Sequence, residues 1–415
     1  MPRREGGFRA PRPTLRPAAS AGGPGAMRYA PRVTRDRSLL GESAELKRAL
    51  EGYADLGSLR AAPEWPALRP RLEALLSTLR RYEPATPPAP ADDPDGVRAV
   101  HWNIEHGNWY DQVEAALTRH VQLAGADLFM FNEIDLGMAR AGNRDVTGDL
   151  AAALGLHGVW APLFLETTHG RDDDSRMAAG RDNEESLFGL AILSRWPIGE
   201  VRVVELPSPE REQFDVERMY GRHIALIATI ERPGAPFVAV AVHLEVHRTR
   251  RDRALQMRTL LETLRGERRP IVLAGDFNSH TFDRGHWWSP LAAGSALILT
   301  PTAWLQRRLL HPDEGPSREP LFDALRESDF EWRRFVDRQP TLGLRFDRLD
   351  EARGLLGAAG AITRPVLDWV ERRAALRLDW FAGRGWRDGR GATVRGLNGP
   401  GLASDHAPLV ARFME

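Results

Sequence analysis

Short apolar segments that end in polar side chains dominate the sequence from residue 97 onward. They predict strands at Val97–Ile104, Asp127–Phe131, Leu187–Leu193, Ile224–Ile230, Phe237–Leu244 and Pro270–Leu273. Apolar residues at helical spacing predict helices at Trp109–Leu123, Arg250–Leu264, near Pro320–Arg326 and at Ile362–Leu376. This mixture of strands and helices predicts an α/β (α+β) fold in which helices cover the sheets.

Three regions with different composition divide the chain. Residues 1–30 are rich in Arg, Pro and Gly and show no periodicity, so we expect a disordered tail. This tail is either a nucleic-acid-binding arm or an over-extended gene start, with Met27 as the candidate true start. Residues 31–95 are expected to form a helical extension and a Pro-rich linker, and residues 96–415 the main domain.

The helical extension contains two amphipathic stretches. Ser43 is expected to cap a helix that runs through Tyr53. A second helix is expected from Pro70 to Tyr82, with Pro70 in its first turn. Both helices are expected to pack on the main domain.

Composition narrows the chemistry. The absence of cysteine excludes disulfides, thiolate nucleophiles and Cys-ligated metals, so any metal must bind oxygen or imidazole ligands. The 57 basic and 57 acidic residues balance, which does not indicate a DNA-coating protein. No apolar run has the length of a membrane span, and the N-terminus has arginines but lacks the apolar segment typical of a secretory signal, so we expect a cytoplasmic protein.

Six segments place a carboxylate, an amide or an imidazole at the end of an apolar strand. They are His101-Trp102-Asn103-Ile104-Glu105, Phe131-Asn132-Glu133, Val242-His243-Leu244-Glu245, Leu273-Ala274-Gly275-Asp276-Phe277-Asn278, Leu378-Asp379-Trp380-Phe381 and Ser404-Asp405-His406. Strand ends are where a rigid scaffold presents reactive side chains on loops. A buried carboxylate there is costly unless it is paired or binds a metal.

The six segments, in this order, resemble the endonuclease/exonuclease/phosphatase superfamily over about residues 96–415. Gly189–Ile198 and the helix that carries Arg253 and Gln256 add to the resemblance. The resemblance implies a four-layer sandwich of two packed, mixed but mostly antiparallel sheets flanked by helices. It also implies a Mg²⁺-dependent phosphoesterase, with Mn²⁺ as the alternative metal, that hydrolyses a phosphodiester or phosphomonoester by metal-assisted attack of water.

The resemblance also assigns roles to single residues. Asn103 and Glu133 lie at the metal, and Glu105 and Asp405 are further candidates there. His406 activates water or stabilises developing charge. The other catalytic candidates are Asp379, which orients His406, Asp276, which positions the nucleophile, and Asn278, which contacts a phosphate oxygen.

His243 resembles the histidine of deoxyribonuclease-like and sphingomyelinase-like members and is expected to protonate the leaving oxygen. Glu184 is the candidate carboxylate paired with it, and Glu185 is the reserve. The substrate stays open between DNA, RNA, a phospholipid and a small phosphoester. The alternative function is a non-catalytic binding scaffold, which is expected to have lost Asp276, His406 or Glu133; all three are present.

Overall fold

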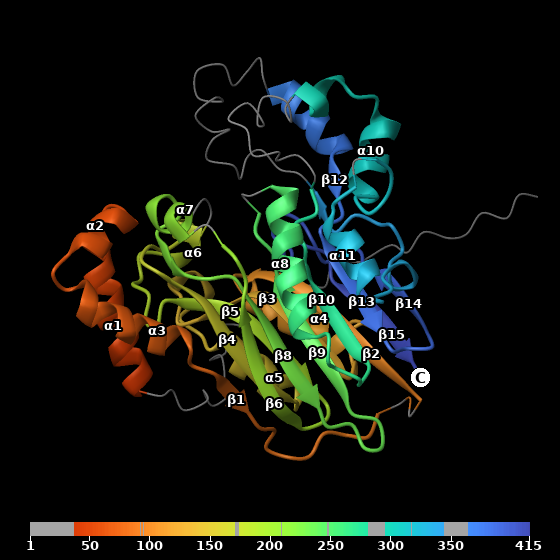
Figure 1. Ribbon diagram of the computed structural model, residues 1–415, viewed down its shortest axis with the longest axis horizontal. Helices are drawn as coiled ribbons and strands as arrows, with labels where there is room; N and C mark the ends of the chain where they lie inside the picture. Colours follow the sequence, from red (N-terminus) through yellow and green to blue (C-terminus); the bar gives the residue numbers. More distant parts are fainter. Residues whose placement is uncertain are drawn as a thin grey trace, which may run out of the picture. The chain divides into compact units, whose positions relative to one another are not determined.

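The computed structural model describes residues 37–91, 93, 95–170, 174–208, 210–246, 249–280, 295–316, 318–343 and 364–415. These residues belong to one compact unit, Arg35–Glu415. Two β-sheets pack face to face in this unit, and helices cover the outer face of each sheet (Figure 1). The predicted α/β sandwich of four layers is therefore confirmed. The tail predicted for residues 1–30 lies outside the described residues.

The larger sheet has eight strands. In spatial order they are β1 (Arg80–Tyr82), β4 (His157–Glu166), β5 (Leu187–Ser194), β3 (Leu128–Leu136), β2 (Gly96–His106), β15 (Leu409–Met414) and β14 (Asp388–Thr393), and β7 (Met219–Gly221) pairs with β4. The smaller sheet has five strands, β13 (Asp379–Arg384), β10 (Ile271–Asp276), β9 (Phe237–His243), β8 (Ile224–Ile230) and β6 (Ile198–Glu205). Pairing is antiparallel except between β2 and β3 and between β9 and β10.

Alternation along the strands builds the core between the sheets. In β2, Val97 and Ala99 face the opposite sheet, while Val100 and Trp102 face the covering helices. Successive side chains on a strand point to opposite faces, so a strand covered on both sides is apolar throughout. Burial on both faces explains why the sequence shows continuous apolar runs at these strands. The alternation also determines which face of the sheet each residue further along the strand occupies.

Helices cover both outer faces. On the larger sheet these are α1 (Arg37–Glu51), α2 (Leu56–Ala61), α3 (Trp65–Leu76), α4 (Tyr110–Arg119) and α5 (Val146–Leu154). On the smaller sheet they are α8 (Arg250–Thr263) and α11 (Leu321–Glu327). Helix α8 begins where predicted because Thr249 and Asp252 form a capping box.

Short elements complete the described part. They are the helices α6 (Asp174–Ala178), α7 (Glu210–Asp215) and α10 (Thr302–Leu310), the 3-10 turns η1 (Ala139–Ala141) and η2 (Arg333–Phe335), and the strand pair β11 (Leu342–Gly343) and β12 (Ala375–Leu376). Residues 364–373 are helical, as expected from the predicted helix Ile362–Leu376; its first two residues lie outside the described part. No helix in the described ranges is long and apolar enough to cross a membrane.

Two details of the predicted N-terminal helices are wrong. Ser43 lies inside α1, where its hydroxyl donates to the Leu40 carbonyl at 3.2 Å, and so does not cap the helix. Helix α3 has Pro66 in its first turn and carries Pro70 in its interior. The chain leaves this helix before Tyr82, which lies in β1 and pairs with the larger sheet.

The first prediction concerns Gly275, which precedes Asp276 in β10. A Cβ at this position would overlap the carbonyl oxygen of Val242 on β9. We expect Gly275→Ala to force the two strands apart and to lower the free energy of unfolding by about 1–3 kcal/mol. Urea denaturation measures the change. The control is Gly266→Ala, whose added Cβ meets nothing within 4 Å; equal stability of the two variants would contradict this packing.

Candidate active site

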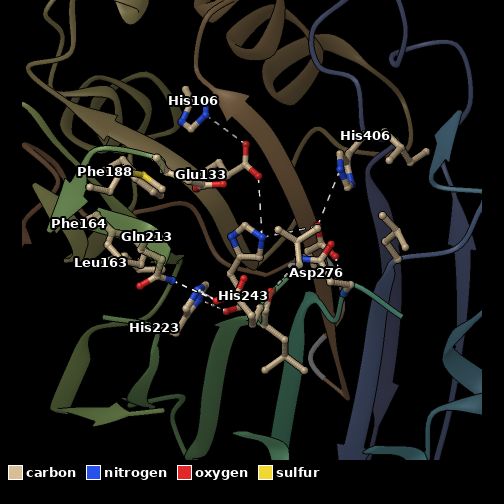
Figure 2. A pocket seen from close by; sticks show the side chains of 18 of the residues that line it. His106, Glu133, Leu163, Phe164, Phe188, Gln213, His223, His243, Asp276 and His406 are labelled. Carbon is tan, nitrogen blue, oxygen red and sulfur yellow. Dashed lines mark hydrogen bonds and ion pairs between the residues drawn. The ribbon is translucent and has the colours of Figure 1, made fainter. Parts of the chain in front are cut away.

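The candidate active site lies at one end of the space between the two sheets, where the inner-facing rows of side chains turn from apolar to polar. In the smaller sheet Asp276 on β10 is the register partner of His243 on β9 and of Asp379 on β13. In the larger sheet His101 and Asn103 continue the inward-facing row of Ala99 on β2. A cavity of about 480 Å³ opens at this end, and Glu133, His243, Asp276 and His406 line it (Figure 2).

Two irregularities in the larger sheet aim Glu133 at this cavity. The register of β3 shifts between Phe131 and Ile134 against β5, and the register of β2 shifts between Asn103 and His106 against β3. Glu133 sits in this shift with a φ of 48°. In a regular strand Glu133 would face the opposite side from its neighbour Asn132; the bulge turns its side chain toward the cavity at a cost in backbone strain.

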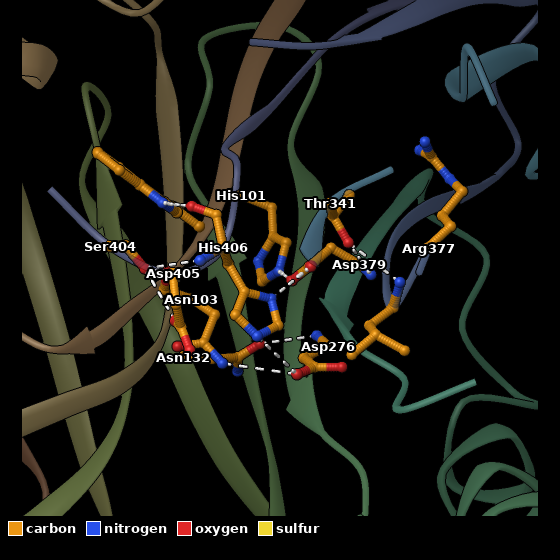
Figure 3. A network of polar contacts seen from close by, with 12 residues as sticks. His101, Asn103, Asn132, Asp276, Thr341, Arg377, Asp379, Ser404, Asp405 and His406 are labelled. Carbon is orange, nitrogen blue, oxygen red and sulfur yellow. Dashed lines mark hydrogen bonds and ion pairs between the residues drawn. The ribbon is translucent and has the colours of Figure 1, made fainter. Parts of the chain in front are cut away.

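Asp379 holds two imidazole rings, one on each carboxylate oxygen (Figure 3). Its Oδ2 lies 2.7 Å from Nδ1 of His406, and its Oδ1 lies 3.0 Å from Nε2 of His101. The hydroxyl of Thr341 accepts the backbone N–H of Asp379 at 3.3 Å. Burial opposes protonation of His406, but the attraction of Asp379 raises the pKa of His406 well above its usual value. The predicted orienting pair of Asp379 and His406 is thus present as a hydrogen bond.

Contacts to β2 fix the loop that carries His406. The indole N–H of Trp102 donates to the His406 carbonyl at 2.8 Å. The hydroxyl of Ser404 donates to the Asn103 carbonyl at 2.7 Å and accepts the His406 backbone N–H at 3.1 Å. His406 is therefore held by its main chain as well as by its ring, and its Nε2 is left 3.9 Å from Oδ2 of Asp276.

Asp276 lies at the centre of these groups. Its Oδ1 accepts the backbone N–H of Asn278 at 2.8 Å. Its Oδ2 lies 3.5 Å from Nδ2 of Asn103, and the same nitrogen donates to Oε1 of Glu133 at 2.8 Å. Burial and the nearby charge of Asp379 raise the pKa of Asp276 to about 7. Two carboxyl groups, those of Glu133 and Asp276, therefore meet at the Asn103 amide.

This donor set fits a hard divalent cation. Glu133 and Asp276 are carboxylates that converge on Asn103, and no arginine or lysine of the described residues pairs with either of them. Oxygen ligands of this kind suit Mg²⁺ or Mn²⁺. Asp276, Asp379 and His406 also lie close enough together to share an ion. However, hydrogen bonds to imidazoles already occupy both oxygens of Asp379, which leaves Glu133 and Asn103 as the other groups here that could hold a cation.

Asn278 follows β10 in a left-handed conformation with a φ of 47°. Its Nδ2 donates to the Leu244 carbonyl at 2.8 Å, and the same nitrogen has a second hydrogen. Asn278 lines the cavity, as its predicted contact with a phosphate oxygen requires.

Glu105 and Asp405 lie at the edge of the site. The backbone N–H of Glu105 donates to Oδ1 of Asn103 at 3.2 Å. The carboxylate of Asp405 accepts from Ser404 at 3.4 Å. Neither residue lines the cavity. Both remain candidates for supporting a bound metal indirectly, Glu105 through Asn103 and Asp405 through His406.

The predicted partner of His243, Glu184, and the reserve Glu185 do not line the cavity that His243 lines. The carboxylates of Asp276 and Glu133 lie 3.8 Å and 3.9 Å from Nε2 of His243. Glu184 donates its backbone N–H to the Gly137 carbonyl, and Glu185 is buried against Gly137. The pairing of His243 with either glutamate therefore stays a prediction.

The surroundings of His243 bear on its expected role. Burial and the neighbouring rings of His223 and His406 lower the pKa of His243 to about 3, which favours the neutral ring. A role as proton donor stays a prediction for this residue. His223 lies behind it, with Nδ1 3.1 Å from the His243 carbonyl and Nε2 3.0 Å from Oε2 of Glu245.

The sequence interpretation missed a buried cluster behind Glu133. His106 lies 3.5 Å from Oε2 of Glu133 and 3.4 Å from Oδ1 of Asp135. Burial opposes protonation of His106, but Asp135 and Glu133 attract the proton and raise its pKa to about 9. Arg140 donates to Asp135 at 2.8 Å and 3.1 Å. His106 directly follows Glu105 in the sequence, which was the available signal. Arg140 lies seven residues after Glu133, outside any of the six motifs, and no local pattern marks it.

Asn132 was also missed as a functional residue, although it stands in the motif with Glu133. Its Oδ1 accepts the backbone N–H of Asp276 at 2.8 Å, and its Nδ2 donates to the Val242 carbonyl at 3.1 Å. One side chain of the larger sheet thus satisfies the ends of β9 and β10 in the smaller sheet.

Comparison with known proteins agrees with this geometry. The model of the Endonuclease/Exonuclease/phosphatase family matches residues 100–406. No curated protein matches the chain. An endonuclease/exonuclease/phosphatase from Beutenbergia cavernae is 18% identical, with a TM-score of 0.47 over 77% of this chain and 72% of that one. The human Nocturnin catalytic domain is 15% identical, with a TM-score of 0.40 over 77% and 94% of the two chains. Sphingomyelinase C from Streptomyces griseocarneus is 13% identical, with a TM-score of 0.41 over 77% and 99%.

The second prediction concerns the link made by Asn132. Asn132→Ala leaves the N–H of Asp276 and the carbonyl of Val242 buried without a partner, which should cost roughly 2–5 kcal/mol of unfolding free energy. Urea denaturation measures this cost, and Gln122→Ala, at an exposed position, is the amide control. A stability close to that of Gln122→Ala would show that the two sheets do not depend on this side chain.

Proposed function

Because the chain belongs to the endonuclease/exonuclease/phosphatase family, we propose that it is a divalent-metal-dependent phosphodiesterase that cleaves its substrate with water. The observation that carries this proposal is that Glu133, Asp276 and His406 line one cavity, where the amide of Asn103 contacts both carboxylates from behind. Members of this family are typically metal-dependent hydrolases of phosphoester bonds, and the residues that such chemistry needs lie within reach of one another here.

We propose that Glu133 and Asn103 hold the cation, with Mg²⁺ as the expected ion and Mn²⁺ as the alternative. A bound divalent cation would neutralise the phosphate and stabilise the charge that develops in the transition state. His106 contacts the second oxygen of Glu133 and would keep that carboxylate in its orientation. Glu105 and Asp405 would act from further out.

The other steps of the reaction, which are orientation of the water, binding of the phosphoryl oxygen and protonation of the leaving oxygen, are assigned to different side chains. Asp276 would orient the attacking water and take up the proton that this water loses, and His243, which faces the same carboxylate, would accept a hydrogen bond from the water. The spare N–H of Asn278 would bind a phosphoryl oxygen. Attack on phosphorus breaks the bond to the leaving oxygen, which needs a proton. His406, held through Nδ1 by Asp379 with Nε2 toward the cavity, would stabilise this oxygen and protonate it.

Apolar walls favour a particular class of substrate. The apolar side chains that line the cavity include Leu163, Phe164, Phe188, Leu376 and Leu378. A ligand pocket with such walls and a few polar groups binds molecules that bury apolar surface. We therefore propose a phosphodiester that carries an apolar group.

A polynucleotide fits this cavity less well. Binding of a nucleic-acid backbone relies on several contacts between phosphates and basic side chains. Among the described residues that line the cavity, Arg140 is the only arginine, and its guanidinium contacts Asp135, Glu166 and Asp174. Nucleic acid remains the competing substrate class in the experiment below.

The third prediction tests metal dependence and substrate together. Treatment with EDTA should abolish hydrolysis of bis(4-nitrophenyl) phosphate, and Mg²⁺ or Mn²⁺ should restore it. Glu133→Gln should lower turnover by about 10²–10⁴-fold, while Glu200→Gln, at an exposed position, should have no effect. Sphingomyelin, inositol phosphates, RNA and single- and double-stranded DNA complete the panel. Full activity without metal would refute the proposed chemistry, and a preference for DNA or RNA would refute the proposed substrate class.

The fourth prediction concerns the pair formed by Asp379 and His406. A carboxylate that only orients an imidazole has no further effect once the imidazole is gone, so the two losses should not add. Asp379→Asn should lower turnover almost as much as His406→Ala, and the double variant should be scarcely slower than His406→Ala. Turnover per folded molecule and melting temperature separate this outcome from a purely structural role. Losses that multiply in the double variant would show that the residues act independently.

A further inference from the structure

His101 has no role in the reaction described so far, although it is fully buried beside the catalytic residues. It lies on β2, two residues before Asn103, and therefore faces the space between the sheets. Its Nδ1 is 3.1 Å from the carbonyl oxygen of Met130 on β3, and its Nε2 is 3.0 Å from Oδ1 of Asp379 on β13. The ring thus spans from the larger sheet to the smaller one (Figure 3).

Hydrogen bonding fixes the orientation of this ring. A carbonyl oxygen only accepts hydrogen bonds, so Nδ1 of His101 carries a hydrogen. The other nitrogen, Nε2, faces Oδ1 of Asp379, so a turn of the ring would break both contacts at once.

The same contact settles the geometry of Asp379. Each of its two oxygens has its own imidazole, and the carboxylate plane is held from both ends. His406 contacts only Oδ2, so any rotation of the carboxylate would carry the His406 ring with it. A single-ended contact would leave that rotation free.

We propose that His101 is a positioning residue of the reaction: it clamps Oδ1 of Asp379 so that Oδ2 holds His406 with Nε2 toward the phosphoryl group. This inference rests on the proposed phosphodiesterase function and adds a third member to the Asp379–His406 pair. The competing explanation is that His101 only fills space, since its ring also packs edge-on against Phe381 at 6.3 Å between centroids.

Three variants separate these explanations. His101→Leu removes both hydrogen bonds and keeps an apolar side chain. His101→Gln retains an amide N–H that can donate to Asp379. Val100→Ala is the control, because Val100 is a buried neighbour on the opposite face of β2 and should affect stability but not the site. Each variant is made in the wild-type chain and in the His406→Ala chain, with kcat and KM measured on bis(4-nitrophenyl) phosphate per folded molecule.

We expect His101→Leu to lower kcat by about 10- to 100-fold with KM changed less than about twofold, the usual cost of losing a group that orients a catalytic one. His101→Gln should recover most of this loss. In the His406→Ala chain, His101→Leu should leave the residual rate unchanged, because the group that it positions is absent. Val100→Ala should keep the wild-type kcat.

Other outcomes overturn the inference. A wild-type kcat for His101→Leu, or an equal fold-loss with and without His406, would show that the ring only fills space. If His101→Leu does not fold, His101→Gln against His101→Asn decides, because the shorter amide should not reach Asp379; equal kcat for the two would contradict the clamp. A wild-type protein that hydrolyses no phosphoester would refute the proposed function. The His406 Nδ1–H signal in proton NMR then still reports the clamp, and it should weaken in His101→Gln less than in His101→Asn.

Discussion

Two carboxylates buried side by side are the constraint on which this structure depends. Asp276 and Asp379 are register partners on adjacent antiparallel strands, and like charges directly opposite one another in a sheet repel. The protein treats them differently. Asp379 receives an imidazole on each oxygen, whereas Asp276 accepts one backbone N–H and a long contact from the Asn103 amide, which also donates to Glu133. The asymmetry leaves the oxygens of Asp276 less fully hydrogen-bonded than those of Asp379, as the role proposed for Asp276 requires.

Both sheets contribute to the burial of these two carboxylates. The smaller sheet contributes the row of His243, Asp276 and Asp379, whose spacing follows from strand register. The larger sheet contributes the groups that satisfy this row, with Asn132 on the backbone of Asp276 and His101 on the side chain of Asp379. The apolar core between the sheets therefore does more than stabilise the fold, because its thickness sets the distance between the two rows.

The sequence predicted six of the strands, and it named most of the residues that meet at the site, because both follow from local patterns. An apolar run that ends in Asp276 or Glu133 identifies a strand end without knowledge of its neighbours. The strands β4, β6, β14 and β15 were not predicted. Contacts between distant residues were not predicted either. The partner of His101 is 278 positions away, and no residue near His101 indicates it. Glu184 was the predicted partner of His243 because it precedes β5, but it does not line the cavity, and a sequence pattern does not reveal the path of a loop. The left-handed conformation of Glu133 was equally hidden, because it arises from a shift in pairing with two other strands.

The position of β15 bears on how the protein folds. This strand is inserted between β2 and β14, and the His406 carbonyl just before it accepts a hydrogen bond from Trp102, a separation of 304 residues. Contacts so far apart in sequence close late, because the entropy of a long loop is lost before they form. During synthesis β2 therefore waits with one edge unpaired until β15 has left the ribosome. Exposed strand edges promote association between chains, so this interval is the period of greatest aggregation risk. The contact between Trp102 and His406 then forms in the same step that closes the sheet.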